Sequence, residues 1–167
     1  MTLGLLMLRI ALGAILIGHG LRKLDARLGA GPVQTGRYFE SLGFTPGVPF
    51  AVATGLAEAL GGLMLGIGFL TPLAVAMVLG VLANAANQER VRGFWVENRG
   101  AEYPVFLGVT ALTLAFTGPG SASVDHALGL DLGGPAGAAG AIVLAAVATA
   151  PVLLLAGRGR RTAGAGR

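Results

Sequence analysis

Apolar residues run in five long stretches along the chain, and short polar segments separate them. The stretches cover approximately residues 3–21, 49–70, 72–86, 103–117 and 135–156. A helix needs about 20 mostly apolar residues to cross a bilayer core that is about 30 Å thick. The pattern therefore predicts an all-α integral membrane protein with five transmembrane helices.

Positive charge is confined to one side of this five-span arrangement. The first gap between the stretches, the third gap and the C-terminal tail hold four, three and four cations, which is 11 of the 12 Lys and Arg residues. Because cytoplasmic loops carry the Lys/Arg excess, we expect an outside N-terminus and a basic cytoplasmic tail at 158–167. The fourth stretch is short, but without its crossing the arginines of the tail would lie outside.

Composition excludes several classes of protein. Hydrophobic residues make up 54% of the chain and charged residues 12%, whereas soluble domains carry about 25% charged residues. The net charge of +4 lies in loops beside the membrane, where anionic lipid attracts it, so we expect no nucleic-acid partner. The absence of cysteine excludes thiol chemistry, and with two histidines we expect no metal.

Two charged residues lie deep inside predicted spans. A charge in hydrocarbon costs at least about 2.5–3.5 kcal/mol, so it marks a functional site by default. At 1.5 Å per helical residue, Arg9 lies about 18 Å from the inner end of its span at Leu21, and Glu58 lies about 14 Å from Pro49. These depths predict an Arg9–Glu58 ion pair, either as a clamp between helices or in proton or ligand handling.

A second group of polar residues is predicted at the cytoplasmic ends of three spans. We interpret His19 and Glu102 as candidates for proton handling, because imidazole and carboxylate pKa values are readily tuned near neutrality. Lys23, Asn84, Asn87 and Tyr103 are candidates for ligand binding. The alternative is that all six are solvated helix ends.

Aromatic residues Phe94 and Trp95 follow in the third gap. An interfacial anchor is the favoured interpretation, and the alternative is a cover that stacks on a flat ligand ring and makes Trp95 a ligand-binding residue. The outer loop at 119–134, with Asp125 and Asp131 as its charges, is expected to contribute no site chemistry. There a substitution of Asp125 should be silent.

Local signals place several helix ends. The segment GRYFESLGF at 36–44 predicts a short interfacial helix that Gly43 stops. Thr71 followed by Pro72 predicts the start of the third span, so that the second and third spans form a tight outer hairpin. Gly62 and Gly66 form a small-residue pair typical of close helix packing in membranes.

Four segments together resemble the DoxX/DoxD family of small bacterial and archaeal membrane proteins, over approximately residues 3–130. They are LRIALGAILIGHGLRKL, GRYFESLGF, GLAEALGGLMLGIGFLTPLA and GFWVENRGAEYPVFLG. The resemblance implies a four-helix transmembrane bundle over 1–130, to which this chain adds a fifth C-terminal transmembrane helix at 131–157. The positions that match the family pattern are Arg9, His19, Gly20, Lys23, Glu58, Gly61, Gly62, Glu102 and Pro104.

The resemblance also implies a function. Some relatives are subunits of a thiosulfate:quinone oxidoreductase, and others are tied to membrane oxidoreductase assemblies in thiol and oxidative-stress homeostasis. We therefore expect a plasma-membrane subunit that binds quinone or a similar apolar ligand at its cytoplasmic face beside a redox partner subunit. A non-enzymatic scaffold or small-solute carrier is the alternative. Whether the chain is itself an enzyme and whether it forms a homo-oligomer stay open.

Overall fold

The computed structural model describes residues 2–164 of the 167-residue chain, with side chains from Leu3 to Ala150 and at Val152. In these residues the chain is all-helical, at 79% helix, and has no strand. The elements are α1 Thr2–Leu24, α2 Gly31–Ser41, α3 Gly47–Ile67, α4 Thr71–Glu89, η1 Arg90–Arg92, η2 Val96–Asn98, α5 Glu102–Thr117, α6 Val124–Ala127 and α7 Gly134–Gly164. The predicted all-α fold is confirmed.

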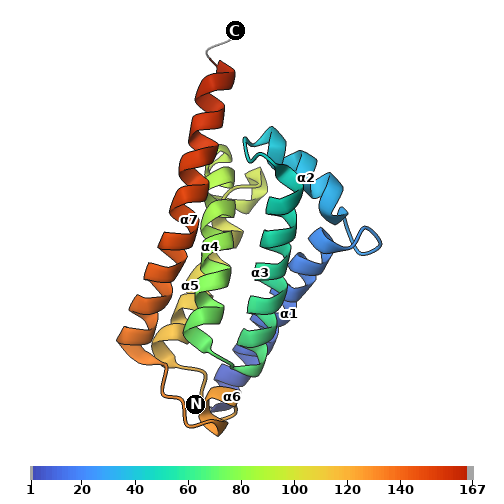
Figure 1. Cartoon of the computed structure of the whole chain (residues 1–167). Helices are drawn as coiled ribbons and strands as arrows, with labels where there is room; N and C mark the ends of the chain where they lie inside the picture. Colours follow the sequence, from blue (N-terminus) through green and yellow to red (C-terminus); the bar gives the residue numbers. More distant parts are fainter. Residues whose placement is uncertain (1, 165–167) are drawn as a thin grey trace.

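Within the described residues, three helices are long and apolar enough to cross a membrane. They cover Leu3–Leu24, Gly47–Ile67 and Thr71–Arg92. The chain is therefore a multi-pass membrane protein, and five crossings remain a prediction because the apolar helices at Glu102–Thr117 and Gly134–Ala150 are shorter. The five long helices alternate in direction, so α7 runs toward the end of the bundle opposite the N-terminus (Figure 1). Its backbone stays helical beyond the predicted end at residue 156, and residues 165–167 of the predicted tail lie outside the described residues.

Glycines let α1 and α3 pack with their backbones in close contact. A Cβ atom on Gly13 would lie 2.5 Å from the carbonyl oxygen of Gly62 and 3.2 Å from the Cα of Gly66. A Cβ on Gly20 would lie 2.5 Å from the carbonyl oxygen of Gly55. Small residues support such close approach between membrane helices, so the predicted packing role of Gly62 and Gly66 is confirmed.

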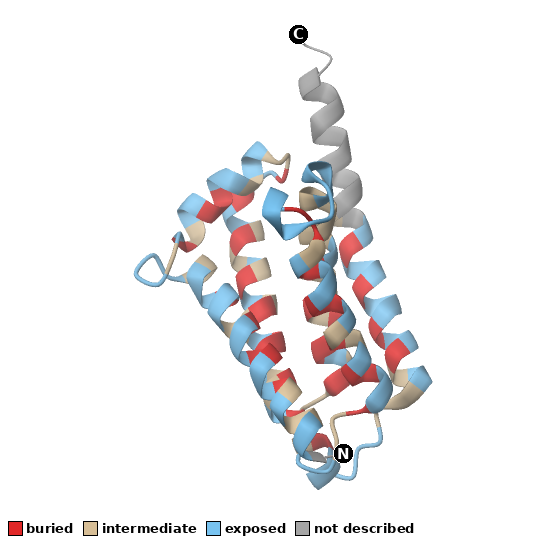
Figure 2. Ribbon diagram, turned by 180° about the vertical axis from the view of Figure 1, so that it is seen from behind, coloured by how far each residue is buried: buried red, intermediate tan, exposed pale blue. Residues whose placement is uncertain are grey.

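The second group of helices is α4, α5 and α7, which pack on one another through small apolar residues. Its buried residues include Ala74, Val78, Ala111 and Ala141, which join Leu12, Leu16 and Leu65 of α1 and α3 in a single core. Figure 2 shows the buried residues on the facing sides of the two groups and the exposed residues on the outside. Both views show the two groups diverging toward the end where α2 lies.

Helix α2 crosses the start of α3 at this more open end (Figure 1). It begins at Gly31, ahead of the predicted helix at 36–44, because Pro32 occupies its first turn, where proline is favoured. It ends at Ser41, and Gly43 follows with a φ of 91°. The predicted glycine stop is confirmed, since this left-handed conformation favours glycine.

Asp125 holds the opposite end of the bundle together. Its side chain is fully buried and accepts hydrogen bonds from the backbone N–H of Leu70 at 2.7 Å, from the backbone N–H of Thr71 at 3.0 Å and from the Thr71 hydroxyl at 2.7 Å. Thr71 begins α4, so a carboxylate from the short helix α6 binds otherwise unpaired N–H groups at a helix start. Asp125 therefore has a structural role that the sequence interpretation of the outer loop did not assign, while a silent substitution in a redox assay stays a prediction.

Arg9 is buried at this same end and does not pair with Glu58. Its guanidinium donates to the carbonyl oxygen of Ala122, and Gly68 lies directly against it. The predicted Arg9–Glu58 ion pair is wrong because it assumed that Leu21 and Pro49 lie at one depth. In the structure Gly55 packs against Leu24, so α3 starts well beyond the end of α1.

We predict that Asp125→Asn destabilises the protein by about 1–3 kcal/mol, because the NH2 group that replaces one carboxylate oxygen cannot accept a hydrogen bond and leaves a buried donor unpaired. Thermal unfolding of the purified protein in detergent measures the effect. Asp131→Asn is the matched control, since Asp131 belongs to the same outer segment and is exposed. Equal unfolding temperatures for the two variants would contradict the role of Asp125.

Candidate functional site

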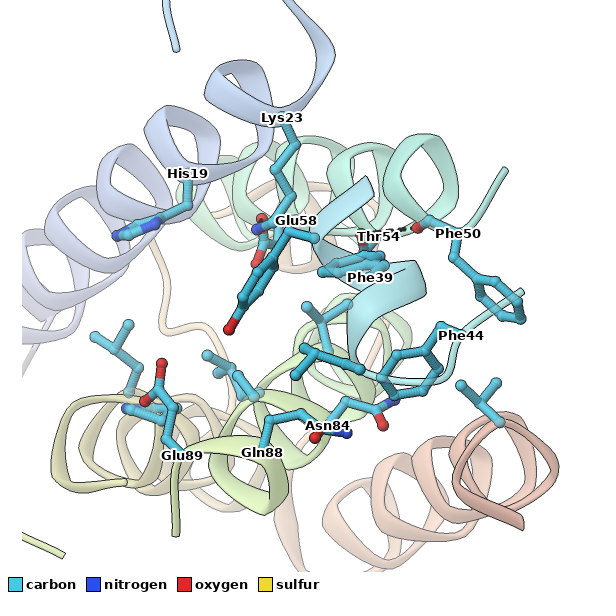
Figure 3. A pocket seen from close by; sticks show the side chains of 18 of the residues that line it. His19, Lys23, Phe39, Phe44, Phe50, Thr54, Glu58, Asn84, Gln88 and Glu89 are labelled. Atoms are coloured by element: carbon cyan, nitrogen blue, oxygen red, sulfur yellow. Dashed lines mark hydrogen bonds and ion pairs between the residues drawn. The ribbon is translucent and has the colours of Figure 1, made fainter. Parts of the chain in front are cut away.

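A cavity of about 240 Å³ lies at the end of the bundle where α2 crosses α3. Helices α1, α2, α3, α4, α5 and α7 all contribute to its wall. The core cluster, by contrast, gathers toward the end held by Asp125. The divergence of the two helix groups therefore leaves space for a site at the other end, and Figure 3 shows the side chains that surround it.

A buried ion pair forms one wall of the cavity. The ammonium of Lys23 on α1 donates to the carboxylate of Glu58 on α3, and these side chains are 22% and 7% exposed. The close glycine packing of α1 on α3 brings these two residues to one level. Figure 3 shows them meeting on the wall formed by these helices. A carboxylate in an apolar environment requires such a partner.

His19 and Tyr103 join α1 to α5 beside the ion pair. The His19 Nε2 and the Tyr103 hydroxyl oxygen lie 3.3 Å apart in a hydrogen bond, and the ring centroids are 5.8 Å apart. His19 lies one helical turn before Lys23, so α1 presents both side chains on one face. This face therefore offers an imidazole and an ammonium to the same cavity.

Helix α4 forms the opposite wall with Asn84, Gln88 and Glu89, of which Asn84 and Gln88 face the ion pair across the cavity in Figure 3. The side-chain oxygen of Asn84 is buried and has no hydrogen-bond partner among the described residues. An unpaired buried acceptor costs about 1–3 kcal/mol. Asn84 is consequently suited to accept a hydrogen bond from a bound molecule.

Aromatic rings from α2, from the connection that follows it and from the start of α3 close the cavity. The centroids of Phe39 and Phe44 are 6.0 Å apart, and those of Phe44 and Phe50 are 5.9 Å apart. Such spacings are typical of interacting ring pairs. The site thus combines an apolar aromatic surface with a few polar groups, a composition typical of small-molecule sites.

Four of the six predicted site residues line the cavity, namely His19, Lys23, Asn84 and Tyr103. The other two lie outside its lining. Asn87 accepts a hydrogen bond from Arg90 Nε at 2.8 Å, and Glu102 accepts one from the Val96 backbone N–H at 2.9 Å.

Trp95 also lies outside the cavity lining. Its side chain is 62% exposed and packs edge-to-face on Phe94 at 5.2 Å. This placement agrees with an interfacial anchor and gives Trp95 no position as a cover of the cavity.

The sequence interpretation did not assign several cavity residues to a site. Phe50, Thr54 and Glu58 recur every four residues on α3, and Asn84 and Gln88 do the same on α4. Residues four apart share one helix face, so this spacing was a usable signal. The depth of Glu58 in its span had suggested Arg9 as a partner, whereas the helix face that Glu58 shares with Phe50 and Thr54 indicates the cavity.

The chemistry of the lining favours an uncharged ligand. Lys23 and Glu58 neutralise each other, and Glu89 adds a further carboxylate. Among the described residues of the wall, an anionic head group would therefore meet no cation other than the paired Lys23. Within the described residues, no group of three or more His, Asp or Glu side chains could hold a metal ion.

Comparison with known protein families shows which family the chain belongs to. The sequence profile of the DoxX family matches residues 4–97, which cover α1 to α4 and most of the segment that follows. The chain belongs to the DoxX family. The match confirms the resemblance over these residues, while α5, α6 and α7 lie beyond it. No curated protein and no solved structure matches the chain.

We predict that Lys23→Met and Glu58→Gln each destabilise the DoxX-family chain by roughly 1–3 kcal/mol, below the 3–5 kcal/mol typical of a completely buried pair, because Lys23 is partly exposed. The double variant should recover part of the loss. A double-mutant cycle on unfolding in detergent measures the coupling.

Arg9→Met supplies the control for this cycle. Its combination with Glu58→Gln should be additive within about 0.5 kcal/mol, because distant sites without shared partners do not couple. Coupling between Arg9 and Glu58, together with additivity between Lys23 and Glu58, would overturn the observed pairing.

Proposed function

We propose that this protein is a membrane subunit for quinone-linked or oxidative-stress redox chemistry that binds a quinone-type ring in its cavity. The observation that carries the proposal is the combination, in one cavity, of an aromatic wall with neutral hydrogen-bonding groups and a self-neutralised ion pair. Membership of the DoxX family supports the association with redox chemistry.

The size of the cavity fits a single substituted ring. An apolar cavity of about 150 Å³ in another protein holds a benzene molecule, and this cavity has about 240 Å³. A flat ring would pack against Phe39, Phe44 or Phe50, since offset and edge-to-face contacts between rings are favourable. The aromatic wall would thereby orient the plane of the ring.

Polar groups on two walls would bind the oxygens of such a ring. His19 and Tyr103 supply N–H and O–H donors to a carbonyl oxygen, whereas the carbonyl oxygen of Asn84 accepts from the hydroxyl of a reduced ring. The site could therefore bind both the oxidised and the reduced form. Imidazole is suited to proton exchange near neutral pH, so His19 remains our candidate for proton handling.

Electrons would have to come from outside this chain. Protein side chains of the kinds present here do not carry electrons, and redox cofactors perform that chemistry. The proposal accordingly includes a redox partner subunit in the same membrane. The chain itself would supply the ring site and the proton-handling group.

The test is binding of a tailless quinone to the purified protein in mild detergent, alongside mass spectrometry of lipids that co-purify with it. We predict that His19→Ala weakens ring binding about fivefold, since one net hydrogen bond contributes about 1 kcal/mol. His126→Ala is the matched control, because His126 is exposed at the opposite end of the bundle. Absence of both ring binding and co-purified quinone would favour the scaffold or carrier instead.

The cavity would face the cytoplasmic side of the plasma membrane. The end of the bundle that holds it also carries the exposed arginines Arg22, Arg27, Arg90, Arg92 and Arg99, and the cytoplasmic side of a membrane protein carries such an excess.

We predict that green fluorescent protein fused after Arg167 is fluorescent, because it folds in the cytoplasm and not when exported through the general secretion pathway. Alkaline phosphatase fused at the same place should be inactive. An active phosphatase on a membrane-inserted chain would contradict the combination of an outside N-terminus with five crossings.

A further inference from the structure

A second hollow lies on the outer face of α5 and meets the cavity at Tyr103. It is a groove of about 420 Å³ that is lined by Phe94, Val96, Glu102, Tyr103, Val105, Phe106 and Val109. Tyr103 lines the groove and the cavity alike. One side chain therefore separates a ring-sized cavity from an apolar groove on the surface of the bundle.

Helix α5 has two faces that serve these two spaces. Pro104 and Leu107 are buried and line the cavity, whereas Phe106 and Val109 are 68% and 60% exposed and line the groove. Val109 lies six residues beyond Tyr103, which is about 9 Å along the helix axis. The groove thus extends along an apolar helix toward the middle of the membrane.

The segment at 93–102, which leads into α5, forms the wall of the groove at the start of that helix. The backbone N–H of Glu102 donates to the Phe94 carbonyl oxygen at 2.7 Å, and that of Ala101 donates to the Gly93 carbonyl oxygen at 3.2 Å. The Glu102 carboxylate accepts from Val96 at 2.9 Å. These bonds hold Phe94 and Val96 over α5 and satisfy the polar groups that border the groove.

We propose that the groove holds the apolar tail of the same ligand whose ring occupies the cavity, with Tyr103 at the junction of ring and tail. This inference rests on the proposed function. Membrane quinones carry long hydrocarbon tails, and a cavity of about 240 Å³ that is filled by a ring leaves no room for one. The groove adjoins the cavity at Tyr103, which lines both, its lining is apolar apart from Glu102 and Tyr103, and it lies on the exposed face of α5.

The hydrogen bond between Tyr103 and His19 lies where the two spaces adjoin. This bond joins the side chains of α1 and α5. A ligand ring that passes from the bilayer into the cavity would replace it, because its oxygen would take the place of one partner. Tyr103 is therefore a positioning residue for the tail as well as a donor to the ring.

The experiment compares a decyl-substituted quinone with its tailless analogue on the full chain in mild detergent. Trp95 is the only tryptophan of the chain and packs on Phe94 at the head of the groove, so its fluorescence reports occupancy. In Val109→Phe, which fills the groove, the decyl quinone should bind about five- to tenfold more weakly while the tailless analogue binds as in wild type.

Val143→Phe is the matched control, because Val143 is 59% exposed on α7 and does not line the groove. It should leave both affinities unchanged. If Val109→Phe binds both quinones as wild type does, the groove holds ordinary lipid and the inference is overturned while the ring site stands. If wild type binds neither quinone, the proposed function fails and this inference fails with it.

A photoreactive group at the end of the decyl tail gives an independent measurement. Cross-links mapped by mass spectrometry to residues 105–109 of α5 would support the inference. Cross-links confined to α4 or α7 would show that the tail leaves the cavity by another side and would overturn it.

Discussion

The register of α1 against α3 determines the partners of two buried charged residues, Arg9 and Glu58. Gly13, Gly20, Gly55 and Gly62 allow backbone contact between the two helices, and any side chain there would force them apart. In this register Lys23 meets Glu58, while Arg9 reaches the loop that carries Ala122. A shift by one helical turn would leave Glu58 in an apolar environment without a cation, at a cost of several kcal/mol.

The two ends of the bundle differ because polar groups have different uses at each. At the end with Asp125, the carboxylate pairs with the start of α4 and the Arg9 guanidinium pairs with a loop carbonyl, so charge serves to close the structure. The apolar core fills the adjoining space. At the other end the helix groups diverge, and the polar groups surround a cavity, with the His19–Tyr103 hydrogen bond as a link between the two groups. Rigidity at one end thereby permits a preformed site at the other.

The sequence predicted the features that depend on neighbouring residues, such as helix starts and ends. It did not predict contacts between residues that are far apart in the chain. Apolar stretches, the Thr71–Pro72 helix start and the Gly43 stop are local signals, and the structure confirms them. Depth along isolated helices could not show that α3 begins beyond the end of α1, since the course of α2 sets that offset. Asp125 was missed because its partners at Leu70 and Thr71 lie more than 50 residues away. A Gly/Ser-rich loop gives no local sign of such a role.

The cavity is lined both by residues inside the segment that matches the DoxX family and by residues beyond it. The matched segment at 4–97 supplies the ion pair, His19, the phenylalanines and the α4 wall, while Tyr103 and Val152 come from helices beyond it. The matched segment would therefore set which ring is bound. Helix α5 contributes to the cavity through one face and to the groove through the other, so it would set what is attached to that ring. Substitutions on the exposed face of α5 should change the preference for tail length without changing the preference for the ring.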